Sequence, residues 1–124
     1  MDSMLLNYPD LVKLDSIGRT HENRAIWTLT ISDHDASDEE TEPEVLFTGM
    51  QHASEPLEMQ NLIFFMQYLL ENYSLNARLK EIVNSRQLVF IPCLNPDGYV
   101  FNETTNHSGA ACGAKTGNPM RMEA

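Results

Sequence analysis

The chain has 124 residues, of which 42% are hydrophobic and 21% are charged, the composition of one ordinary globular domain. Its formal net charge of -10 argues against nucleic acid and anionic membrane surfaces as partners. No stretch approaches the roughly 20 apolar residues that cross a bilayer, and no signal-peptide pattern opens the chain. Cys93 and Cys112 are the two cysteines, and their number and spacing predict free thiols rather than a disulfide scaffold.

The first third of the chain is predicted to form a short helix followed by a β-hairpin. Pro9 and Asp10, a proline followed by an acidic residue, suit the first turn of a helix. Residues 15–32 then alternate in the manner of a hairpin, with turn chemistry at Glu22 and Asn23. Apolar residues alternate with others along the second strand, and we expect both of its faces to be at least half-buried.

An acidic run from Asp33 to Glu44 follows the hairpin and has no apolar anchor. Such a segment buries too little area to offset its ordering entropy, so we predict a solvated loop. The alternative is a calcium loop built on Asp33, Asp35 and Asp38. The run lacks the central glycine and the terminal bidentate glutamate of an EF-hand, and this favours the solvated loop.

The middle of the chain predicts a strand, two helices and another strand. Residues 44–50 form a short apolar run that is typical of a strand covered on both faces. Apolar residues then repeat at intervals of three and four from Pro56 to Tyr73, which predicts an amphipathic helix. A shorter helix is expected over residues 75–83, and residues 87–92 read as a second buried strand that Pro92 ends.

This succession predicts an α/β fold with a partial mixed β-sheet flanked by helices. A strand-helix-strand unit implies a parallel pair joined by a right-handed crossover, with ligands expected at the carboxyl ends of the strands. His52 and Asn95 both fall there. The stretch "NPDGY", residues 95–99, has the chemistry of a type I turn, and its simplest interpretation is a reversal after the strand.

The pair formed by His52 and Glu55 is the strongest candidate for chemistry, because imidazole nitrogen and carboxylate oxygen are both good zinc ligands. A catalytic zinc needs three protein ligands and one open position, so this pair could supply two of them. The alternative is a surface histidine beside a glutamate that favours the start of a helix.

Context strengthens the zinc hypothesis. The order "YPDLVKLDSIGRT", "EVLFTGM", "QHASEP", an amphipathic helix and "LVFIPCLNPDGY" resembles the zinc carboxypeptidases, the family that includes carboxypeptidase A. The resemblance covers about residues 8–105, and we predict residues 1–105 to be the N-terminal part of such a catalytic domain. It implies one zinc ion per complete domain, with His52 and Glu55 as the first two ligands. The family often has arginine where this chain has Ser54.

The resemblance also implies which parts of the site this chain lacks. In the family a zinc-activated water attacks the peptide bond, a glutamate takes its proton and an arginine polarises the scissile carbonyl. The base glutamate and the third zinc ligand, a histidine, come from far downstream, so no catalytic residue is assigned within this chain. His21, His34 and His107 could replace that ligand, but the first two are expected to be exposed and the third has no counterpart in the family.

The tail, residues 106–124, lacks apolar periodicity and does not resemble the family. When its possible codons are read from each third base, they permit "GGMWRKNRKPNADGS", which contains a run expected in the family after "NPDGY". We therefore hypothesise a frameshift between about Asn102 and Gly109, with the family's arginine out of frame near Gly113 and Ala114. The alternative is an ordinary disordered terminus.

These expectations describe a zinc metallocarboxypeptidase that removes C-terminal residues from peptides, present here as a truncated fragment that is inactive alone. The implied partners are peptides or proteins with a free C-terminus, and not nucleic acid or membranes. Two alternatives remain, a non-catalytic fold remnant and a metal-independent peptide-binding module at "NPDGY". The family is often secreted, but the chain carries no visible signal peptide, so the compartment is left open.

Overall fold

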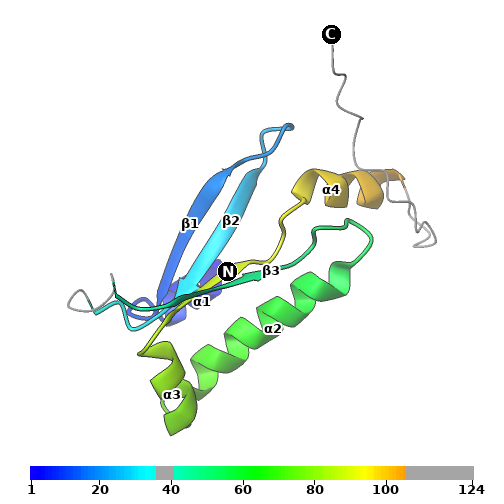
Figure 1. The fold of residues 1–124 in the computed structure, drawn as a ribbon. Coiled ribbons are helices and arrows are strands. Elements are labelled where there is room, and N and C mark those ends of the chain that lie inside the picture. Colours follow the sequence, from blue (N-terminus) through cyan, green and yellow to red (C-terminus); the bar gives the residue numbers. More distant parts are fainter. Residues whose placement is uncertain (36–40, 106–124) are drawn as a thin grey trace.

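The computed structural model describes residues 1–35 and 41–105, drawn in colour in Figure 1. Asp38, His107, Cys112 and the proposed frameshift in the tail lie outside the described residues, so the hypotheses that involve them stay predictions. The elements are, in order, α1 (Asp2–Asn7), β1 (Val12–Arg19), β2 (Ala25–Ile31), β3 (Glu44–Thr48), α2 (Pro56–Asn72), α3 (Ala77–Val83), β4 (Gln87–Ile91) and α4 (Pro96–Thr105).

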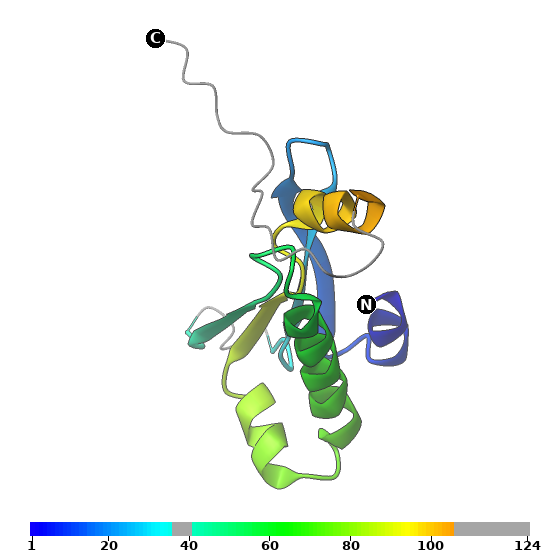
Figure 2. The same ribbon diagram turned by 90° about the vertical axis from the view of Figure 1, so that its right-hand side faces the viewer.

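The four strands form one mixed sheet in the order β1-β2-β4-β3. The first three strands of this order pair antiparallel, and β4 pairs parallel with β3, as the strand-helix-strand pattern predicts. Helix α2 runs along the sheet, with α1 and α3 nearby (Figure 2). The predicted α/β class with a partial mixed sheet is therefore confirmed.

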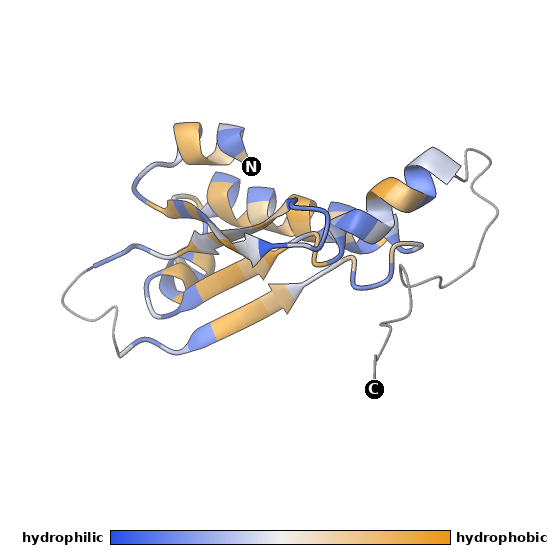
Figure 3. Ribbon diagram, turned by 90° about the horizontal axis from the view of Figure 1, so that it is seen from above, coloured by the Kyte–Doolittle hydropathy of each residue, from blue (hydrophilic) through white to orange (hydrophobic). Residues whose placement is uncertain are grey.

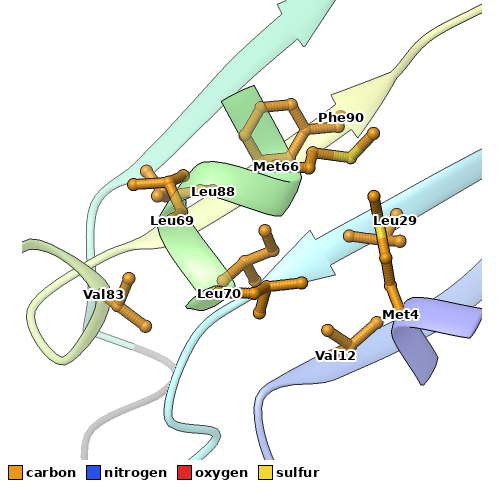
Figure 4. Packing of buried hydrophobic residues seen from close by; sticks show 10 residues of the cluster. Met4, Val12, Leu29, Met66, Leu69, Leu70, Val83, Leu88 and Phe90 are labelled. Atoms are coloured by element: carbon orange, nitrogen blue, oxygen red, sulfur yellow. The ribbon is translucent and has the colours of Figure 1, made fainter. Parts of the chain in front are cut away.

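The core lies between one face of the sheet and helices α1, α2 and α3 (Figure 4). At its centre the fully buried ring of Phe90 stacks on Phe47 at a centroid distance of 4.8 Å. Phe65 of α2 meets the Phe90 ring edge to face at 5.9 Å. Met66 and Leu69 of α2 are also buried, because the intervals of three and four residues bring them onto the side that faces the sheet.

Both central helices form where the sequence predicts them, and their starts follow known rules. Pro56 occupies the first turn of α2, where its missing N–H removes no hydrogen bond. Asn76 caps α3, since its side chain accepts hydrogen bonds from the N–H groups of Arg78 and Leu79 at 3.0 and 3.3 Å.

The predicted helix that begins at Pro9 is wrong, because the short helix α1 lies before this residue. Residues 8–11 form a turn in which the N–H groups of Leu11 and Val12 both donate to Tyr8 O at 3.1 Å. Val12 is then drawn into the core with 2% of its surface exposed, which starts β1 where a helix was expected.

The predicted hairpin is confirmed as β1 and β2, joined by a turn in which Asn23 has a φ of 64°. The expected burial of the second strand fails at Trp27, which is 52% exposed. The reason is that β2 pairs with β4 only over Leu29–Ile31. The half of β2 that contains Trp27 therefore extends past β4 and has β1 as its one neighbouring strand in the described ranges.

Strand β3 is where the sequence predicts it, but the expectation that both its faces are covered is wrong. Leu46 is 60% exposed and Val45 is 36% exposed. Figure 3 shows β3 as a largely hydrophobic strand at the margin of the sheet. Within residues 1–35 and 41–105 it pairs only with β4, and Leu46 lies with its partner Val89 on the face opposite the Phe90 core.

Replacing Phe90 by alanine should lower the free energy of unfolding by about 3–5 kcal/mol, because the change removes both ring contacts and leaves a cavity at the centre of the core. Urea denaturation followed by circular dichroism measures this loss. Phe101→Ala is the matched control, since Phe101 is 48% exposed, and it should cost less than about 0.5 kcal/mol. Equal losses in the two variants would contradict this description of the core.

Candidate metal centre

The two predicted zinc ligands lie in one turn of the loop formed by residues 49–55, which we call the β3–α2 loop. The N–H of Glu55 donates to His52 O at 3.1 Å and closes this turn. Both side chains are exposed, at the carboxyl end of β3 and next to the first turn of α2. An exposed imidazole and a carboxylate at the ends of one turn form an incomplete but chemically suitable donor set for zinc.

The β3–α2 loop is hydrogen-bonded to the segment that leaves β4. The N–H of Gly49 donates to Ile91 O at 3.0 Å, and Gly49 O in turn accepts from the N–H of Leu94 at 3.0 Å. One residue further on, the N–H of Asn95 donates to Met50 O at 3.1 Å. The loop after β3 and the connection after β4 are therefore joined by backbone hydrogen bonds at the carboxyl ends of the two parallel strands, which are labelled in Figure 1.

Glu58, in the first turn of α2, holds the β3–α2 loop from the other side. Its Oε2 accepts a hydrogen bond at 2.9 Å from the N–H of Met50, a fully buried residue with a φ of 54°. A carboxylate at this end of a helix is also favoured by the helix dipole. Glu58 was not predicted from the sequence; the available signal was an acidic residue two positions after Pro56, the proline that starts the helix.

Asn95 joins the β3–α2 loop to α4. Its Oδ1 accepts from the N–H of Gly98 at 3.0 Å, which caps the helix, and its Nδ2 donates to Gln51 O at 3.3 Å. A Cβ on Gly98 would lie 2.7 Å from Asn95 Nδ2 and 3.0 Å from the Cβ of Ala53. Only glycine fits there, because the helix start, the Asn95 side chain and the β3–α2 loop meet at this point.

The prediction that "NPDGY" is a plain reversal is therefore wrong, since the segment starts α4, Pro96–Thr105. A type I turn and the first turn of a helix share their backbone geometry, and the residues that follow decide between them. Asn95 and Pro96 suit the start of a helix as well as a turn, so the signal that separates the two lies in the residues after Tyr99.

Asp97 ties α4 to the tip of the β1–β2 hairpin. Its carboxylate accepts from Thr20 Oγ1 and Arg24 Nη1, both at 2.7 Å, and from the N–H of Glu22 at 3.1 Å. Arg24 also pairs with the side chain of Glu22. Burial raises the pKa of Asp97, but the hydrogen bonds from Thr20, Arg24 and the N–H of Glu22 outweigh it, so this pKa lies below its ordinary value.

No third ligand joins the pair within the part of the chain that the structure describes, where no three His, Cys, Asp or Glu side chains gather in metal-binding geometry. His21 is exposed at the hairpin tip, as predicted. His34 is half-buried rather than exposed: its N–H donates at 3.2 Å to Oγ of the fully buried Ser32, which keeps the chain close to the end of β2 at this point. Cys93 carries the predicted free thiol, whose pKa is raised by burial.

The sequence profile of the zinc carboxypeptidase family matches residues 1–119 of this chain. The chain belongs to the zinc carboxypeptidase family. It is 36% identical over 105 residues to a zinc carboxypeptidase of Saccharothrix mutabilis subsp. capreolus, covering 85% of this chain and 24% of that protein. It is 31% identical over 117 residues to the carboxypeptidase N catalytic chain of Rattus norvegicus, covering 92% of this chain and 26% of that one.

The fold is also that of solved carboxypeptidases. The structure superimposes on carboxypeptidase A from Helicoverpa armigera with a TM-score of 0.68 at 24% identity, covering 82% of this chain and 24% of that one. The chain thus spans about a quarter of the length of these relatives. No helix in the described ranges is long and apolar enough to cross a bilayer.

Asn95→Ala should remove the cap of α4 and the bond to Gln51, and lower the free energy of unfolding by about 1 kcal/mol. The Gly98 N–H, which loses its acceptor, should exchange with solvent faster in an NMR hydrogen-exchange measurement. Asn61→Ala is the control, because this exposed asparagine lies within α2 and caps nothing in the described structure. Unchanged protection at Gly98 would contradict the capping role.

Asp97→Asn should destabilise the chain at pH 7 and have less effect at pH 3. A carboxyl whose folded-state pKa is lowered contributes stability above its unfolded pKa of about 3.9 and loses this contribution as the pH falls through the folded value. Urea midpoints at both pH values measure the difference. Asp10→Asn, in an exposed turn, is the charge-matched control. A loss of the same size at pH 3 as at pH 7 would rule out the ion-pair explanation.

Proposed function

We propose that this chain forms the N-terminal part of a zinc carboxypeptidase catalytic domain and supplies two zinc ligands, His52 and Glu55. The observation that carries the proposal is the turn that contains both residues at the carboxyl end of β3, held by Glu58 and Asn95. A metal site needs residues outside the ligands that hold the ligand loop in place, and the side chains of Glu58 and Asn95 bind this loop. The family of the chain supports the same choice of metal.

The complete protein would hydrolyse C-terminal residues from peptides, which is the activity that the names of its relatives describe. Zinc, when bound, would supply a Lewis acid for the scissile carbonyl and its attacking water. The residues of this chain would orient the two ligands, and the β4–α4 connection would form one wall beside them. Substrates would be peptides or proteins with a free C-terminus, recognised by residues that this chain does not contain.

The chain alone should bind zinc weakly and should not hydrolyse peptides. Two ligands leave a zinc ion less tightly held than the three or four of a complete site, and metal affinity depends on a complete and correctly placed ligand set. Hydrolysis also needs a general base and residues that polarise the scissile carbonyl, and each of these raises the rate by a large factor. No residue between 1 and 105 is assigned either role.

Isothermal titration with zinc tests the ligand assignment. The wild-type chain should bind one zinc weakly, and His52→Ala and Glu55→Gln should each weaken this binding at least about tenfold. His21→Ala is the matched control, because it removes an exposed histidine from the hairpin tip and should leave the titration unchanged.

Zinc binding that is unchanged in His52→Ala would contradict the ligand assignment. Chelator-sensitive release of C-terminal amino acids by the purified chain would contradict its predicted inactivity. If peptides bind the chain without zinc and equally well after His52→Ala, the metal-independent binding module becomes the better description.

A further inference from the structure

Helix α2 carries an apolar stripe on its outer side that the carboxypeptidase site does not use. The stripe consists of Leu57, Phe64, Tyr68 and Leu75, which are 69%, 71%, 44% and 81% exposed. The rings of Phe64 and Tyr68 stack on one another, with their centroids 6.4 Å apart. At about 100° per residue, all four positions lie within about 20° of one line along the helix.

The stripe points away from the sheet. Met66, half-way along it in sequence, is fully buried and lies about 180° from the stripe around the helix axis. Leu75 follows the end of α2, but the N–H groups of Leu75 and Asn76 still donate to Asn72 O at 3.1 and 2.9 Å. These bonds form one further turn after the end of α2, and Leu75 lies in that turn, at the end of the stripe.

The order of residues in the stripe is symmetric. Leu57 and Leu75 lie equally far from position 66, and so do Phe64 and Tyr68. A twofold axis perpendicular to the helix at this position would place each leucine against the other leucine of a second copy, and each aromatic ring against the other ring. Twofold interfaces use the same surface of both subunits, so a self-complementary stripe is what such an interface needs.

The surroundings of the stripe are nearly uncharged, although the chain carries a net charge of -10. Its polar neighbours Gln60, Asn61 and Asn72 are neutral. The charged side chains between Pro56 and Asn76 are Glu58, which accepts a hydrogen bond from the Met50 N–H, and Glu71, which accepts one from Gln67 at 2.8 Å and keeps its charge beside the stripe. Two copies therefore meet less charge repulsion at this stripe than the net charge of the chain suggests.

We propose that two copies of this chain associate through antiparallel packing of their α2 stripes. Each stripe exposes apolar area on the order of a few hundred Å², a size typical of interaction sites on protein surfaces. Burying two of them removes less than the roughly 1,200 Å² of stable specific interfaces, in the range of weak, transient contacts. The dimer is accordingly weak and depends on protein concentration. The proposal does not depend on the carboxypeptidase function, because the stripe contains neither proposed zinc ligand and none of the residues whose side chains hold the β3–α2 loop.

Sedimentation equilibrium of the 124-residue chain, from micromolar to submillimolar concentration, tests the proposal. The wild type should form dimers, and Phe64→Lys and Tyr68→Glu should each raise the dimer dissociation constant by about tenfold or more. An equimolar mixture of the two variants should recover dimers, because antiparallel packing places the introduced positive charge against the introduced negative one. Both side chains are exposed, so circular dichroism should show both variants folded.

Leu6→Lys on α1 and Leu46→Lys on β3 are the matched controls, at residues 79% and 60% exposed, and should dimerise like the wild type. A wild type that stays monomeric throughout would overturn the proposal, as would unchanged association of Phe64→Lys. Loss of dimers in Leu46→Lys would place the contact at the β3 edge instead. Failure of the mixed variants to associate would exclude the antiparallel arrangement.

Discussion

The parallel pairing of β3 with β4 is the constraint on which the candidate site depends. It sets Phe47 and Phe90 side by side in the core and, immediately beyond them at the carboxyl ends of the strands, brings the residues after Thr48 next to those after Ile91. The backbone bonds from Gly49 and Met50 to the β4–α4 connection continue this ladder beyond the strands. The ends of two strands thus fix a loop that would otherwise be free to move.

Sequence patterns predict local features of this chain well, because periodicity and helix-start chemistry depend on residues close together. The pair formed by His52 and Glu55 was visible for the same reason. The contact of Asp97 with Arg24 joins residues 73 positions apart, and no local pattern encodes it. The role of Asn95 was misassigned because its neighbours suit a turn and a helix start equally, and only the residues after Tyr99 distinguish the two.

The exposed apolar residues of β3 show a second limit of sequence patterns. An apolar run predicts burial on both faces of a strand. Val45 and Leu46 belong to such a run, but both are exposed, because β3 is the edge strand of the sheet within the described ranges. A strand edge with free backbone groups and apolar side chains is a surface for further pairing.

The support around the two proposed ligands, His52 and Glu55, is more complete than the proposed ligand set itself. Glu58 and Asn95 hold the β3–α2 loop from α2 and from α4, and Gly98 leaves room for Ala53 against the start of α4. All of these partners come from elements within this chain. A third ligand supplied from elsewhere would therefore meet a loop whose backbone is already positioned, so that less ordering entropy opposes zinc binding. Local folding and metal affinity are thus separable properties of this site, because the loop is ordered by bonds that require no metal.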